Sequence, residues 1–247
     1  MEKIILQCKY EGEQRANYNW GSLFHGFLMQ ALPAETADML HESGLRPFSQ
    51  YILPQTDQQP IWNIGVWEGN MAEQIMKSVG SCSRIELAQK GITLEVGGMQ
   101  RIIQTETEHF SRFFMGDNPC RRYEIEFLTP CTHKKDGGYV LFPSPELIIN
   151  SLSRRYSAYN ENISLDDPAV MQEVTRYIRI VRYSLRSAVY YLESTKITGY
   201  TGSITLVVGG PEQLARLAGA LLSFAEYSGL GIKTALGMGG VRIKQVL

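Results

Sequence analysis

The chain has 247 residues, a formal net charge of −1 and 44% apolar residues, which is the composition of an ordinary globular protein. It contains no run of about 18 apolar residues, so no membrane span is expected. The first residues lack the basic segment and apolar core of a secretion signal, and the four cysteines form no CxxC pair. Together these features favour a reduced, cytoplasmic protein over a disulfide or zinc framework.

Charge is distributed unevenly between the two halves of the chain. Residues 1–118 hold 9 Lys and Arg against 14 Asp and Glu, whereas residues 119–247 hold 15 against 11. A basic half in a nearly neutral chain indicates a polyanionic partner for that half. Chance variation is the alternative at this size.

The first half shows alternating and helical patterns in a regular order. Apolar alternation predicts a strand over residues 3–10, and helical spacing predicts a helix over residues 20–32. Pro33 suits the first turn of a second, short helix over residues 34–40. Then follow the two strands of a hairpin, a helix and a further strand, over residues 46–53, 61–67, 70–79 and 92–107. The order strand, helix, strand, strand, helix, strand is that of a ferredoxin-like fold.

The second half begins after a seam at residues 115–120. Strict alternation predicts a strand over residues 122–128 that returns, through a turn at 134–138, to residues 139–142. Residues 174–191 combine arginines at helical spacing with strand-forming Val, Ile and Tyr, and we favour a strand there. The other predicted elements are a helix, a loop, a strand, a helix and a final strand, over residues 145–156, 160–168, 196–208, 211–227 and 240–247. This half is therefore a second α+β unit.

A glycine-rich stretch precedes the final strand. Its glycines are Gly229, Gly231, Gly237 and Gly239, with Lys233 as the only charged residue between them. Backbone N–H groups beside a lysine suit a phosphate backbone. The alternative is a plain glycine-rich connection between a helix and a strand. The stretch is neither a P-loop nor a dinucleotide fingerprint, since it follows a helix and precedes a strand.

Four arginines lie close together in a stretch that has no acidic residue. They are Arg176, Arg179, Arg182 and Arg186, and tyrosines are interleaved with them. Such a pattern can contact phosphates and stack on bases. A solvated charged face is the alternative.

The four histidines form no HxH or HxxxH pair, so we predict no metal site. His41 ends a short helix, where it can serve as an acid or base near neutral pH or simply complement the helix dipole. His25 lies in the middle of the first helix, where a partly buried histidine without a chemical role is the alternative. His109 and His133 are assigned no role.

Several of these segments together resemble one known family, the CRISPR-associated endoribonucleases that cut precursor CRISPR RNA within its repeats. The family pattern of glycine, apolar, glycine, five residues, glycine, apolar, glycine is matched at every position of residues 229–239. Residues 196–204 are similar to the family's strand with a glycine, an aromatic residue and a second glycine. The segment that starts at Leu40 and His41 resembles the family's Leu-His-x-x-Gly motif. The likeness extends over almost the whole chain.

The resemblance implies an α+β protein of two tandem ferredoxin-like (RRM-like) βαββαβ domains. They are expected over residues 1–117, with the catalytic histidine, and residues 118–247, with the glycine-rich RNA-binding loop. The implied activity is metal-independent cleavage without a cofactor. The 2′-hydroxyl attacks the adjacent phosphate and leaves a 2′,3′-cyclic phosphate and a 5′-hydroxyl.

The same resemblance implies roles for individual residues. His41 takes the position of the catalytic histidine, and Arg46 takes a position often held by a catalytic lysine. His25 matches members that carry their histidine on the first helix, so it is a rival for the role. Some members use a tyrosine on that helix, where this chain has Met29.

The expected partner is CRISPR repeat RNA, and no membrane partner is expected. CRISPR effector-complex subunits and a second copy of the chain are left open as further partners. A competing interpretation is a repeat-RNA-binding subunit with the same fold but no turnover. A third is an unrelated α+β protein whose glycine-rich loop binds a small anion.

Overall fold

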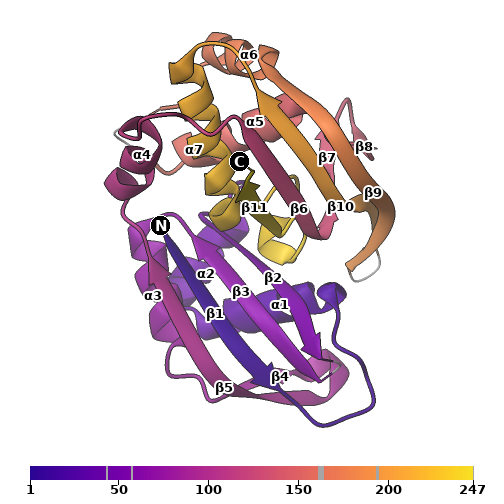
Figure 1. The fold of residues 1–247 in the computed structure, drawn as a ribbon. Coiled ribbons are helices and arrows are strands. Elements are labelled where there is room, and N and C mark those ends of the chain that lie inside the picture. The colour runs from indigo at the N-terminus through magenta and orange to yellow at the C-terminus, as the bar shows by residue number, and fades with distance from the viewer. Residues whose placement is uncertain (43, 57, 161–163, 193–194, 247) are drawn as a thin grey trace.

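The computed structural model describes the chain except for residues 43, 57, 161–163, 193–194 and 247, and it shows two α+β halves with one large antiparallel sheet each (Figure 1). The first sheet has the strand order β2-β3-β1-β5-β4, and the second has the order β11-β6-β10-β9. In both sheets the first strand of the half lies between its third and last strands, as in a ferredoxin-like fold. The prediction of two tandem ferredoxin-like domains is confirmed.

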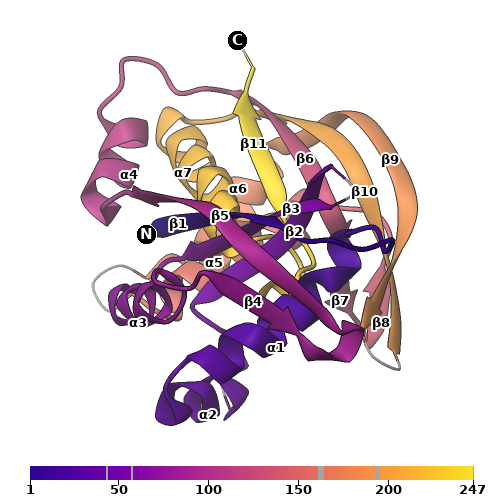
Figure 2. The same cartoon turned by 90° about the horizontal axis from the view of Figure 1, so that it is seen from below.

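The described part of the first half contains three α-helices and two short 3-10 helices besides its five strands. Its elements are β1 (Glu2–Lys9), η1 (Tyr18–Trp20), α1 (Gly21–Ala31), α2 (Ala34–Glu42), β2 (Phe48–Thr56), β3 (Gln59–Val66), α3 (Gly69–Val79), β4 (Arg84–Leu87), η2 (Ala88–Lys90) and β5 (Ile92–Ile103). Figure 2 shows α1, α2 and α3 together on one face of the first sheet.

The second half follows the same order with additions. Its elements are α4 (Glu106–Phe114), β6 (Arg122–Cys131), β7 (His133–Lys135), β8 (Gly138–Val140), α5 (Pro145–Ser157), α6 (Pro168–Arg176), β9 (Ile178–Leu192), β10 (Thr195–Val208), α7 (Glu212–Ser228), η3 (Thr234–Leu236) and β11 (Val241–Gln245). None of the helices in the described part of the chain is long and apolar enough to cross a membrane.

Each half has its own apolar core. In the first half, alternation along β1 turns Ile4 and Leu6 toward Phe24 of α1, as expected for a sheet with one covered face. In the second half, Ile125 of β6 packs with the helices that cover that sheet. Ala235, which lies in the glycine-rich stretch near the chain's end, is buried in the core of the first half.

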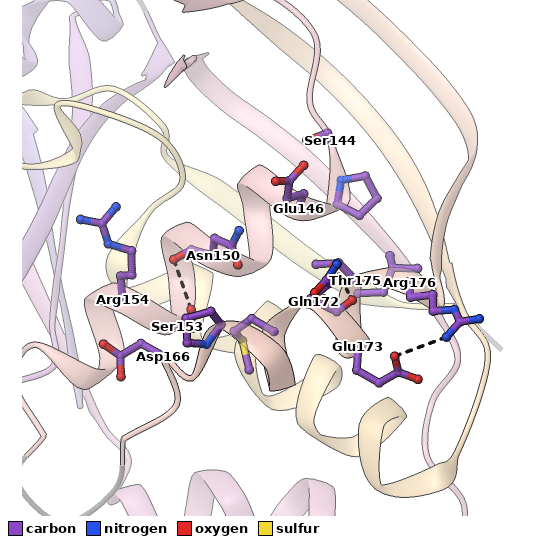
Figure 3. A pocket seen from close by; sticks show the side chains of 14 residues that line it. Ser144, Glu146, Asn150, Ser153, Arg154, Asp166, Gln172, Glu173, Thr175 and Arg176 are labelled. Atoms are coloured by element: carbon purple, nitrogen blue, oxygen red, sulfur yellow. Dashed lines mark hydrogen bonds and ion pairs between the residues drawn. The ribbon is translucent and has the colours of Figure 1, made fainter. Parts of the chain in front are cut away.

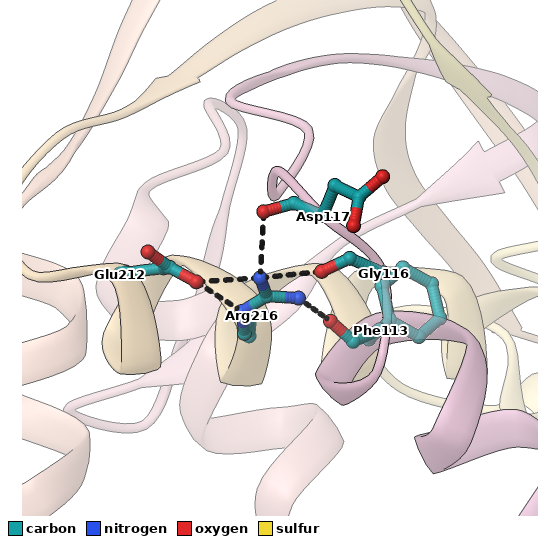
Figure 4. A network of polar contacts seen from close by, with 5 residues as sticks. All are labelled: Phe113, Gly116, Asp117, Glu212 and Arg216. Atoms are coloured by element: carbon teal, nitrogen blue, oxygen red, sulfur yellow. Dashed lines mark hydrogen bonds and ion pairs between the residues drawn. The ribbon is translucent and has the colours of Figure 1, made fainter.

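A buried arginine fixes the segment that follows α4 onto α7 (Figure 4). Arg216 of α7 donates from Nη1 to the carbonyl of Phe113 at 2.5 Å and from Nη2 to the carbonyl of Gly116 at 2.6 Å. Its charge is balanced by Glu212 one turn earlier, at 2.5 Å. The segment after α4 is thus fixed on α7. The boundary between residues 117 and 118 stays a prediction.

Pairing in the second sheet differs from the prediction. Strand β6 pairs with β10 and β11 rather than with residues 139–142. The turn at residues 134–138 instead joins β7 and β8 in a hairpin of their own. Long-range partners therefore outcompete the local return of the chain, because they bury the alternating side chains of β6 against α5 and α7.

Several short elements lie outside the predicted set, among them β4, α4 and α6. The predicted strand over residues 174–191 is confirmed from Ile178 onward, whereas Arg176 ends helix α6. Local capping explains both helices, since Thr105 forms a capping box with Glu108, and Asp167 caps α6 ahead of Pro168.

Candidate active site

His25 lies on the inner face of α1 and is only 7% exposed. Its ring stacks on Phe48 of β2, with centroids 6.1 Å apart. Burial, followed by the positive charges of Arg46 and His41, lowers the pKa of His25 to about 4. The ring is therefore neutral near pH 7. Because it donates a hydrogen bond to the carbonyl of Ala235, the other ring nitrogen is an acceptor, and Nδ1 has no partner among the described residues.

His41 and Arg46 flank the turn that follows α2. His41 lies in the last turn of that helix and is exposed. Arg46 is half-buried, and its Nε donates to the carbonyl of Leu40 at 2.9 Å, which satisfies a free carbonyl at the helix end. Burial lowers the pKa of Arg46 from its usual value near 12.5, yet the group stays charged at neutral pH.

In the structure, His41 and Arg46 lie close enough to His25 to affect its pKa. The charges of Arg46 and His41 both act on the ring of His25. The group combines an exposed imidazole, a neutral buried imidazole and a fixed guanidinium. Such a set can transfer protons and offset negative charge. No three His, Cys, Asp or Glu side chains gather as a metal site in the described ranges.

The glycine-rich loop, residues 229–239, packs directly against α1. Gly237 has a φ of 107°, and a Cβ there would lie 2.8 Å from the Cα of Gly21 and 2.6 Å from the hydroxyl of Tyr190. On the other side, Gly231 has a φ of 79°, and a Cβ there would clash with the carbonyl oxygen of Thr132. Only glycine fits such positions, because both the backbone angle and the space exclude a side chain.

Two buried polar side chains anchor this loop. Gln50 of β2 donates to the carbonyls of Gly21 at 2.8 Å and Ala235 at 3.0 Å, and it accepts from Trp62 at 3.0 Å. Arg155 of α5 donates to the hydroxyl of Thr234 at 2.6 Å and to the carbonyls of Ser228 and Gly231. The loop is therefore held rigidly between the halves.

The charged side chain of the loop, Lys233, stands free of this packing. It is exposed and adopts a left-handed backbone conformation with a φ of 57°. The four glycines predicted to bind RNA are buried, and their close contacts are intramolecular. Lys233 is thus the group of this loop that a ligand can reach most easily.

A cavity of about 440 Å³ lies beside the loop and the turn after His41. It is lined by residues 44–45, by Gly231, Ile232 and Lys233 of the loop, by His133 and Lys134 of β7, and by Leu147, Asn150, Ser151, Arg154 and Arg155 of α5. No described residue that lines it carries a carboxylate. Residues from both halves of the chain line the cavity, and the side chains among them carry a net positive charge.

The predicted arginine cluster lies elsewhere. Arg179, Arg182 and Arg186 are exposed on β9, the edge strand of the second sheet, and Arg176 pairs with Glu173 at 3.6 Å. Arg186 donates to the hydroxyl of Thr201 at 3.2 Å. None of the four lines the cavity. Only the far end of β9 reaches the loop, where Tyr190 donates to the carbonyl of Leu236 at 2.5 Å.

A larger cavity, of about 1230 Å³, lies between α5 and α6 (Figure 3). Its lining includes Glu146, Asp166 and Glu173. Among the described residues that line it there is no histidine. Three carboxylates make it a poor site for a polyanion, because like charges repel.

Four residues of the basic cavity were not singled out from the sequence: His133, Lys134, Arg154 and Arg155. The position of Arg155 in the sequence could have indicated that it is buried. It lies three residues after Leu152 on the apolar face of an amphipathic helix, where a charged residue needs buried partners. No local sequence pattern indicates a role for His133, because its neighbours come from β10 and α5, far away in the sequence.

Several known proteins with similar sequences or structures are described as Cas6. The family model for the CRISPR-associated endoribonuclease Cas6 matches residues 125–241. The Cas6 endoribonuclease of Mycobacterium tuberculosis (strain CDC 1551 / Oshkosh) is 31% identical over 226 residues, which are 91% of this chain and 71% of that protein. That of Streptococcus thermophilus is 27% identical over 228 residues, 90% of each chain.

A solved structure described as a Cas6 product complex matches with a TM-score of 0.78 at 20% identity. The match covers 98% of this chain and 99% of that chain. At this level of identity, the structural similarity is evidence for the fold only.

Proposed function

This chain belongs to the family of CRISPR-associated endoribonucleases named Cas6, and from that premise we propose that it cuts precursor CRISPR RNA within its repeats without a metal. The 2′-oxygen of one nucleotide forms a bond to the adjacent phosphorus while the bond from phosphorus to the 5′-oxygen breaks. The products carry a 2′,3′-cyclic phosphate and a 5′-hydroxyl. The observation that carries this proposal is the convergence of His25, His41 and Arg46 at the junction of the two halves.

The reaction needs one group that accepts a proton and one that supplies a proton. The 2′-hydroxyl loses a proton as it attacks, and the leaving 5′-oxygen gains one. We assign contact with these reacting atoms to His41, because it is exposed at the end of α2. His25 is nearly buried, so we assign it a positioning role.

Arg46 is suited to the charge that develops on the phosphate. Its Nε is fixed on the carbonyl of Leu40, and a guanidinium has further N–H donors in a planar fork. A preorganised cation at this place stabilises the pentacovalent transition state more than the ground state. The proposal therefore assigns Arg46 to transition-state stabilisation.

The glycine-rich loop is assigned to RNA binding rather than to chemistry. Lys233 is its exposed cation, and Gly229, Gly231, Gly237 and Gly239 shape the backbone that presents it. Arg179, Arg182 and Arg186 are exposed on the edge strand β9, so we propose them, with Arg176, as peripheral contacts to RNA phosphates.

The test is cleavage of repeat RNA by the purified protein in EDTA, with analysis of the product ends. A repeat RNA with a single 2′-deoxy nucleotide at the cut site is the matched control. We expect cleavage of the first and binding without cleavage of the second, because the deoxy nucleotide lacks the attacking group. Cleavage of the deoxy RNA would contradict internal attack. Binding of both RNAs with no cleavage of either would favour the non-catalytic repeat-RNA-binding subunit.

Effector-complex subunits and a second copy of the chain stay predictions as further partners. Light scattering of the protein alone tests the second copy.

A further inference from the structure

One of the residues that line the basic cavity beside the glycine-rich loop, His133, has a buried ring nitrogen without a partner. The residue is 4% exposed. Nε2 of this ring has no hydrogen-bond partner among the described residues. Buried polar atoms without a partner are uncommon in folded proteins and call for an explanation.

The side chain of His133 has one described polar neighbour, because the hydroxyl of Tyr200 lies 3.4 Å from its Nδ1. Cys131, whose sulfur also lies 3.6 Å from that hydroxyl, donates its thiol to the carbonyl of Leu230 at 3.3 Å. We take the tyrosine hydroxyl as the donor and Nδ1 as the acceptor. This assignment places the hydrogen of the neutral ring on Nε2.

A second feature of the cavity is positive charge without compensation. Arg155 is buried, and its described hydrogen bonds go to two carbonyls and one hydroxyl, with no carboxylate among them. Burial lowers its pKa to about 10, so it stays charged. Lys134, Arg154 and Lys233 add exposed cations to the same wall. A buried cation without a counter-ion is unfavourable and attracts an anion.

We propose that this cavity binds a single phosphodiester group of the repeat RNA, with the Nε2–H of His133 and the side chains of Lys134 and Arg154 as donors. The inference rests on the proposed function for the identity of the anion. An unpaired N–H donor, surrounding cations and missing carboxylates all select an anion over a cation or a neutral base. Since the cavity adjoins the turn after His41, the bound phosphate fixes the distance of the RNA strand from the histidines.

The first experiment measures binding of the uncleavable deoxy repeat RNA to two variants at the same position. His133→Leu removes the donor and keeps the volume, whereas His133→Gln restores an N–H donor. We expect His133→Leu to weaken binding about tenfold, the cost of one charge-assisted hydrogen bond, and His133→Gln to recover most of it. Equal affinities of the wild type and both variants would overturn the proposal.

Substitutions of exposed residues provide a second test, because they are not expected to disturb folding. Lys134→Ala and Arg154→Ala are each expected to lower the slope of log Kd against log salt by about 0.7 to 0.9, the value for one phosphate contact. Lys77→Ala is the control, because Lys77 is exposed on α3 in the first half. Slopes that change no more than in the control contradict the proposal.

Nuclear magnetic resonance of the His133 ring separates RNA from free anions. A phosphate beside the ring stabilises its protonated form, so the pKa of His133, which burial and Arg155 lower to about 4, should rise when deoxy RNA binds. We expect inorganic phosphate to do so only at millimolar concentration. A shift with stoichiometric phosphate but none with RNA would refute the assignment to RNA. The readouts involve no cleavage, so the cavity and the catalytic proposal fail independently.

Discussion

At the scale of single residues, two histidines 16 positions apart have opposite environments. His41 is exposed at a helix end, whereas His25 is buried against Phe48. Desolvation and the charges of Arg46 and His41 keep His25 neutral. A neutral ring beside the guanidinium of Arg46 limits the positive charge that is buried at the junction. It also leaves an acceptor at Nδ1, which suits a group that orients its neighbours.

Replacement of His41 by alanine should lower the cleavage rate constant by about 10²–10⁴-fold, the usual contribution of a general acid or base. Affinity for the deoxy repeat RNA should change little, because the proposed phosphate contacts remain. Asp38→Ala, an exposed change one turn earlier on α2, is the control and should cleave normally. If His41→Ala cleaves like the wild type and His25→Ala does not, the proton-transfer role belongs to His25.

The lowered pKa of His25 predicts a loss of stability in acid. Between the ordinary value of 6.5 and the folded value of about 4, the unfolded chain binds a proton that the folded chain does not. The free energy of unfolding therefore falls as the pH falls through this window, by up to about 3 kcal/mol for this one residue. His25→Gln should remove that part of the pH dependence. Urea unfolding of both proteins from pH 7 to pH 4 measures the difference, and parallel curves would contradict it.

At the scale of elements, the glycine-rich loop shows what a local pattern can reveal. Its position between a helix and the last strand was predictable, because the spacing of Gly229, Gly231, Gly237 and Gly239 is local. The reason for the glycines was not, since their contacts lie at Gly21 and Thr132, far away along the chain. The same holds for His133, whose partners Tyr200 and Arg155 come from other elements.

A methyl group at Gly237 tests how much of the loop is packing. Gly237→Ala should lower the free energy of unfolding by more than about 1 kcal/mol, because φ is positive and a Cβ would meet the backbone of Gly21. Gly26→Ala in α1 is the matched control. Nothing lies within 4 Å of its Cβ position, so it should stabilise by about 0.5–1 kcal/mol. Denaturant unfolding compares the two, and equal effects would refute the packing argument.

At the scale of the whole molecule, the two halves share one topology but depend on each other. The order of elements in the first half was enough to predict its ferredoxin-like fold, because amphipathic periodicity is strong there. In the second half, the pairing of β6 with β10 and β11 could not follow from local alternation. Neither could the docking of Ala235 in the first core. The site arises at this junction, where α1 and α2 from one half meet the loop from the other.

Gln50 connects the halves at that junction and allows the coupling to be measured. Gln50→Leu would leave the indole N–H of Trp62 without its partner and would take one hydrogen bond each from the carbonyls of Gly21 and Ala235, the second of which keeps its bond from His25. We expect a loss of about 2 kcal/mol or more in the free energy of unfolding, since a buried unpaired group costs about 1–3 kcal/mol and each lost hydrogen bond adds to it. Trp62→Phe removes the orphaned indole donor. The double variant should therefore be more stable than the sum of the single changes implies, by about 1–2 kcal/mol.

The Gln50→Leu variant also tests whether the site is disturbed in protein that is still folded. Gln50 joins α1, which carries His25, to the loop that carries Lys233. Gln50→Leu should therefore slow cleavage of repeat RNA at temperatures where circular dichroism still reports a folded protein. The rate is measured with enzyme in excess, so that binding is saturated. A normal rate in the folded variant would mean that each half holds its part of the site without the other.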